Sequence, residues 1–160
     1  MPLRFFRLPH LAALALLYPW LVPAPALASG GVSCNGKSVA AEITASAGVE
    51  HGWGAAVSDP AAQITLNDKE VPEDLRATPL ALTLVHHWIF GDDVKLHFIR
   101  EGLQGKAVRV VEAVIETRNV PDAAELRGTF TIHVFDMDPP HDAEGGRVLE
   151  FKGEASCLME

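Results

Sequence analysis

Apolar and polar residues alternate with a period of two over most of the chain after residue 28, and this pattern constrains the fold more than any other feature. Side chains of a β-strand point to opposite faces in turn, so such alternation is typical of strands with one buried face. Gly, Pro, Asn and Asp clusters separate the alternating segments, and no long amphipathic helix is evident. The predicted strands are Val39–Ser46, Ala62–Leu66, Leu80–Phe90, Val94–Arg100, Lys106–Thr117, Glu125–Phe135 and Arg147–Ser156. In the strands Lys106–Thr117 and Glu125–Phe135, the side chains expected on the inward face are Val108, Val110 and Val114 and, opposite them, Leu126, Phe130, Ile132 and Val134.

These segments predict an all-β fold, a single antiparallel β-sandwich or small β-barrel of about seven strands. The one helical signal is Val71–Arg76, where Pro72 suits a first helical position and two acidic residues follow it. One or two helical turns are expected there.

The first 28 residues have the composition of a secretory signal peptide. Arg4 and Arg7 precede an apolar run over Leu11–Val22, and Ala26-Leu27-Ala28 provides a small-x-small cleavage motif. The apolar run is short for a transmembrane helix, which needs about 20 such residues. We therefore expect one exported β domain over residues 29–160, released into the periplasm or outside the cell, with no membrane span in the mature chain.

The mature chain is acidic, which narrows the choice of partner. It holds 11 of the 13 basic residues and all 21 acidic ones, a formal charge of 11 − 21 = −10. No Lys/Arg cluster occurs in it, and affinity for nucleic acid depends on such residues displacing counterions. Nucleic acid is therefore not expected as a partner.

The chain contains two cysteines, Cys34 and Cys157, close to the two ends of the mature domain. An isolated pair in an oxidising compartment usually forms a disulfide, which here would join the first strand to the last. The alternative is a lipid-modified Cys34, but Gly31-Val32-Ser33 lacks the usual leucine and Cys157 would stay unpaired.

The hairpin between Leu80–Phe90 and Val94–Arg100 carries the first candidate site. With a three-residue loop, Gly91–Asp93, the even-numbered residues from Leu80 to Phe90 would form one apolar face. This face includes His86 and Trp88, and it would lie beside Val94, Leu96 and Phe98 of the next strand. In that register His87 lies directly opposite His97 on the polar face, where two imidazoles can share copper or zinc. A solvated histidine pair without metal is the alternative.

Two further segments are candidates for a ligand or partner loop. Asp136, Asp138, His141 and Asp142 lie in an acidic stretch that could attract a hard cation but departs from an EF-hand loop, so a polar turn is the alternative. Trp53 stands between glycines in residues 48–56, where it could anchor a partner or fold back to cover one end of the sandwich.

No catalytic motif is present: the sequence lacks a nucleophile elbow, a phosphate-binding glycine loop and a metal-binding His-Glu-x-x-His helix. Glu112 and Glu116 share one strand face with valines and are the only candidate acid/base pair, which would make the protein a small hydrolase.

The general layout resembles that of small disulfide-clipped β-barrels of bacterial envelope proteins, such as the periplasmic inhibitors of c-type lysozyme. The likeness rests on the signal, the early Cys34, the β core and the late Gly-x-x-x-Cys from Gly153 to Cys157. The inhibitory serine and lysine motif of that family has no counterpart here, so the resemblance implies the layout alone.

The leading functional hypothesis is therefore an exported, non-enzymatic binding or interaction module for a protein or small ligand of the cell envelope. A copper or zinc binding protein is the first alternative, and the small hydrolase is the second. No cofactor is expected unless His87 and His97 bind copper or zinc.

Overall fold

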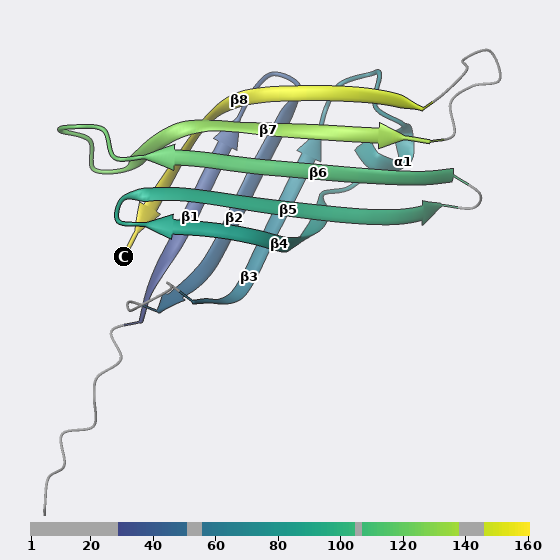
Figure 1. Cartoon of the computed structure of the whole chain (residues 1–160). Helices are drawn as coiled ribbons and strands as arrows, with labels where there is room; N and C mark the ends of the chain where they lie inside the picture. Colours follow the sequence, from purple (N-terminus) through teal and green to yellow (C-terminus); the bar gives the residue numbers. More distant parts are fainter. Residues whose placement is uncertain (1–28, 51–55, 105–106, 138–145) are drawn as a thin grey trace, which may run out of the picture.

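The computed structural model describes residues 29–50, 56–104, 107–137 and 146–160, which form a closed antiparallel β-barrel with one short helix (Figure 1). The strands are β1 (Ser29–Lys37), β2 (Ala41–Glu50), β3 (Val57–Leu66), β4 (Leu80–Phe90), β5 (Asp93–Gln104), β6 (Ala107–Arg118), β7 (Leu126–Asp136) and β8 (Arg147–Met159), and the helix is α1 (Glu73–Arg76).

The predicted all-β antiparallel fold is confirmed; of the two predicted alternatives, sandwich and barrel, the structure has the barrel, with eight strands instead of about seven. The strand that the sequence pattern missed is β1, whose sequence is dominated by glycine and small polar residues. Val32, Cys34 and Gly36 occupy its inward positions, so buried and exposed residues do alternate in β1. Gly36 has no side chain, however, and this obscures the apolar pattern in the sequence.

Each strand pairs with the next along the chain, and β8 returns to pair with β1. A disulfide joins Cys34 to Cys157 across this closing pair, where the two residues are direct register partners. The predicted clip between the first and last strands is therefore present. A disulfide is consistent with an oxidising compartment.

The barrel interior is filled by side chains, among them Phe130, which is fully buried. A Cβ atom added to Gly36 would lie 2.5 Å from Phe130 Cδ1, and one added to Gly153 would lie 2.7 Å from Phe130 Cζ. The two glycines thus leave the space that the aromatic ring occupies. Other large buried side chains include Phe98, Ile43, Ile64, Leu66, Leu96, Ile115 and Ile132.

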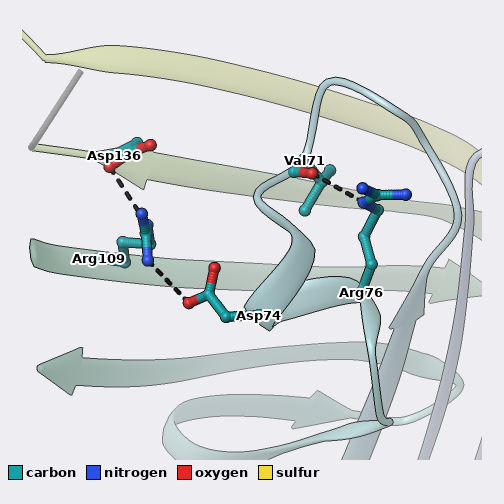
Figure 2. A network of polar contacts seen from close by, with 5 residues as sticks. All are labelled: Val71, Asp74, Arg76, Arg109 and Asp136. Atoms are coloured by element: carbon teal, nitrogen blue, oxygen red, sulfur yellow. Dashed lines mark hydrogen bonds and ion pairs between the residues drawn. The ribbon is translucent and has the colours of Figure 1, made fainter. Parts of the chain in front are cut away.

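Helix α1 lies at one end of the barrel, as Figure 1 shows, in the place where the sequence predicted a short helix. Its Leu75 and the preceding Val71 are buried in the core. Arg109 contacts Asp74 of the helix at 2.7 Å and Asp136 of β7 at 3.3 Å (Figure 2). One guanidinium therefore ties the helix to two strands of the barrel.

The predicted register of the β4–β5 hairpin is wrong. The connection is a two-residue turn, Gly91-Asp92, with Gly91 at φ 57°, a conformation that suits tight hairpins. In an unbroken strand a two-residue turn would mix polar and apolar residues on each face, but a β-bulge between Leu84 and His86 absorbs the shift. Val85 is the extra residue, and the inward face changes from the even to the odd positions there.

The predicted face of β6 is wrong as well. Val108, Val110 and Val114 were expected inside, yet the buried side chains of β6 are the alternate ones, Val111, Ala113, Ile115 and Thr117. Valines occupy both faces of this strand, so its own pattern does not decide the register. The neighbouring strand decides it, because Leu96 and Phe98 are buried and pair with Ile115 and Ala113. In β7 the predicted inward residues Leu126, Phe130, Ile132 and Val134 are confirmed.

Candidate binding surface on the outer face of the barrel

An aromatic pair on β4 is the most exposed apolar feature close to the β4–β5 turn. Beyond the bulge, Trp88 and Phe90 lie on the outer face, where they are 64% and 74% exposed, and their ring centroids are 6.4 Å apart. The sequence pattern placed both side chains in the core. It missed their exposure because nothing in the sequence of β4 marks the bulge at Val85.

The turn beside this pair is attached to the β6–β7 connection. The Asn119 side-chain amide donates a hydrogen bond of 2.7 Å to Asp92 Oδ2 at the tip of the hairpin. The aromatic pair therefore lies beside a turn whose tip is tied to the β6–β7 connection.

The bulge also changes the histidine pair. His86, not His87, is the register partner of His97, and their rings are stacked with centroids 6.0 Å apart. His86 was expected in the core but is exposed on the outer face. His87 pairs with the buried Leu96, so its side chain belongs to the inner face, yet it too is exposed.

A row of alternating imidazoles and carboxylates crosses the outside of the barrel from β5 to β8. His97 Nε2 lies 2.7 Å from Glu112 Oε1, without the alignment of a hydrogen bond, and Glu112 Oε2 lies 3.9 Å from His133 Nδ1. His133 Nε2 in turn lies 3.0 Å from Glu150 Oε2, and Lys152 Nζ lies 2.7 Å from Oε1 of the same carboxylate. His97 on β5 and His133 on β7 are two strand spacings apart, and Glu112 on the intervening strand β6 bridges that distance.

No group of three or more His, Cys, Asp or Glu side chains within the described ranges has an arrangement that could hold a metal ion. The copper or zinc hypothesis for His87 and His97 stays a prediction, although the two residues are not the directly opposed pair on which it was based. Lys95, a neighbouring cation on this face, forms an ion pair with Glu116.

The carboxylates of the hydrolase hypothesis face outward. Glu112 and Glu116 share their strand face with Val114, as predicted, but that face is outside the barrel. Glu112 contacts His97 and His133, whereas Glu116 contacts Lys95. Each carboxylate therefore has its own cationic or titratable neighbour, and a shared acid/base role has no support in this geometry.

Of the predicted ligand loop, the structure describes Asp136 alone. Asp136 ends β7, is 9% exposed and contacts Arg109 at the barrel end that α1 occupies (Figure 2). Asp138, His141 and Asp142 lie outside the described residues, and so does Trp53.

Comparisons with protein-family models, with curated proteins and with solved structures found no match to this chain. No helix within the described residues is long and apolar enough to cross a membrane.

The contacts of Glu150 with Lys152 and His133 affect the pKa of the Glu150 carboxyl group. A hydrogen bond from Lys152, the larger cause, and one from His133 hold the pKa of Glu150 below its ordinary value. A carboxyl group whose pKa is lower in the folded state than in the unfolded state stabilises the fold at pH values above its unfolded pKa. This stabilisation is lost as the pH falls through the lowered pKa of the folded state.

Lys152→Met is therefore expected to raise the pKa of Glu150 more than His133→Gln does, as measured by carbon-detected NMR titration of the carboxyl. An unchanged pKa in Lys152→Met would show that the ion pair does not form in solution.

Proposed function

We propose that this protein is an exported, non-enzymatic interaction module that binds a partner protein through the β4–β5 hairpin. The observation that carries the proposal is the exposure of Trp88 and Phe90 side by side on the outer face. Large aromatics at the centre of a contact supply much of the binding energy in protein interfaces. Two of them left in water at the end of one hairpin favour a surface that a partner covers.

The packed interior favours a protein partner over a small ligand held in the barrel lumen. Phe98 and Phe130 are buried there with almost no exposed surface. The space beneath α1, between Leu75, Arg109 and Val111, has a volume of about 20 Å³. That is room for about one water molecule and too little for an organic ligand.

Site-specific photo-cross-linking in the exporting host tests this proposal. Trp88 is replaced by p-benzoylphenylalanine, and a matched variant carries the same group at Val148, which is 56% exposed on the outer face of β8. We expect a discrete protein adduct from position 88 that is absent from position 148. Phe90→Ala in the same chain should weaken the adduct, because it removes half of the aromatic pair.

The result that would contradict the proposal is the absence of any adduct at position 88, or the same adducts from positions 88 and 148. Either outcome would show that the aromatic pair does not mark a specific contact.

A further inference from the structure

The pairing between β3 and β4 ends early and leaves most of β4 with one neighbour. Three residue pairs join these strands, the last of them Ala62 with Leu82, whereas eleven pairs join β7 to β8. In the part of the chain that the structure describes, residues Thr83–Phe90 pair with β5 alone. Figure 1 shows β3 and β4 diverging beyond their point of contact. We call this one-sided stretch, Thr83–Phe90, the β4 edge.

The two strands that border this divergence differ in their capacity to accept another strand. On the β3 side, Asp59 has φ 46° and is followed by Pro60, which has no N–H to donate. Natural sheets use proline and lysine in this way to prevent pairing at an edge. The β4 edge contains neither residue, and beyond the bulge it runs through His86–Phe90 without further irregularity.

The inner face of β4 is also incompletely covered along this stretch. His87 pairs with Leu96 and Ile89 with Val94, and both partners on β5 are buried. His87 is nevertheless exposed, and Ile89 is only half-buried. An added strand beside β4 would cover these two side chains and supply hydrogen-bond partners to the free side of the backbone.

The charges around the β4 edge favour a basic occupant. Asp92 and Asp93 at the hairpin turn and Asp59 across the divergence are all exposed. Lys95, the cation opposite Trp88, is already paired with Glu116. A second copy of this chain is disfavoured by the same charges, because two mature chains of net charge −10 would meet.

From these observations we infer that the β4 edge binds an extended, basic segment of a partner protein as an additional strand. The inference rests on the proposed function and specifies its binding mode. The bound segment pairs its backbone with Thr83–Phe90 and directs alternate apolar side chains toward His87 and Ile89. Its basic residues face the three aspartates.

Amide hydrogen exchange with synthetic peptides tests the inference. The probe is a peptide of alternating valine and lysine, and its controls are the same peptide with a central proline and a peptide of alternating valine and glutamate. We expect the valine–lysine peptide to slow exchange at alternate amides of Thr83–Phe90 by about tenfold or more at saturation. Neither control should do so, because proline interrupts the backbone pairing and glutamate meets the aspartates.

Two results would overturn the inference: no added protection of the β4 edge, or equal protection by the valine–glutamate peptide. Concentration-dependent dimers in sedimentation, with the β4 edge protected in them, would also overturn it in favour of a second copy. If the β4 edge stays unprotected while the cross-link at position 88 still forms, strand addition is wrong and the proposed function stands.

Discussion

Replacing both Cys34 and Cys157 by alanine is expected to lower the free energy of unfolding by about 5 kcal/mol, since the disulfide closes a loop with a sequence separation of 123 residues. A crosslink over so long a loop removes much of the conformational entropy of the unfolded chain. Alanine is the suitable replacement because both side chains are buried, and serine would leave a hydroxyl inside the barrel.

The same substitution is expected to loosen the closing pair of the barrel. Six residue pairs join β1 to β8, and backbone hydrogen bonds between Gly31 and Glu160 extend this contact. Urea unfolding of the double variant and of the reduced wild type should give similar, lowered midpoints. A midpoint equal to that of the oxidised wild type would show that the disulfide does not form in the folded protein.

Phe130→Ala is expected to cost about 3–5 kcal/mol, the range for removing a fully buried phenylalanine without collapse of the surrounding structure. Gly36 and Gly153 lie against its ring and have no side chains with which to fill the resulting cavity. The companion variant Gly153→Ala should cost about 1–3 kcal/mol in the wild-type background, because its new methyl group overlaps the ring.

The two substitutions should be coupled. In the Phe130→Ala background the added methyl at Gly153 has free space on the ring side, so its cost should fall, although Lys37 O still lies 2.9 Å from the new Cβ. Gly102→Ala is the matched control, since an added Cβ there meets no atom within 4 Å. Additive costs for Phe130→Ala and Gly153→Ala in urea unfolding would show that the glycine is not required by the ring.

The parts of the fold that the sequence predicted are those in which one residue pattern determines the structure. In β7 a single face carries Leu126, Phe130, Ile132 and Val134, and this face is inside. In β6 valines occupy both faces, so the register depends on Leu96 and Phe98 of the neighbouring strand. Alternation within one strand contains no information about that neighbour.

The candidate binding surface was missed for a related reason. The residues of β4 alternate as if one face were buried along its whole length, and the bulge at Val85 reverses the faces halfway. The sequence pattern favours the three-residue loop over the tight turn at Gly91-Asp92, because nothing in the sequence marks the bulge that accommodates the tight turn. The row from His97 to Glu150 depends on the registers of β5 to β8 together, so single-strand patterns do not predict it.

The combination of a disulfide-closed barrel and a one-sided β4 has a physical logic. The closing disulfide and the packed interior keep most strands in fixed pairs, so β4 is already ordered in the free protein. The entropic cost of ordering it is therefore not part of the binding free energy. A partner segment that adds to β4 then needs to order only itself. Without a partner segment, an unpaired strand edge that lacks proline and lysine would favour aggregation.

Amide hydrogen exchange of the free protein along β4 tests the central claim most directly. We expect an alternating pattern over Thr83–Phe90, in which amides directed at β5 are protected and those on the opposite side exchange at rates close to those of an unfolded chain. Protection of every amide in this stretch would contradict it, because the far side of β4 would then already be occupied within the free protein.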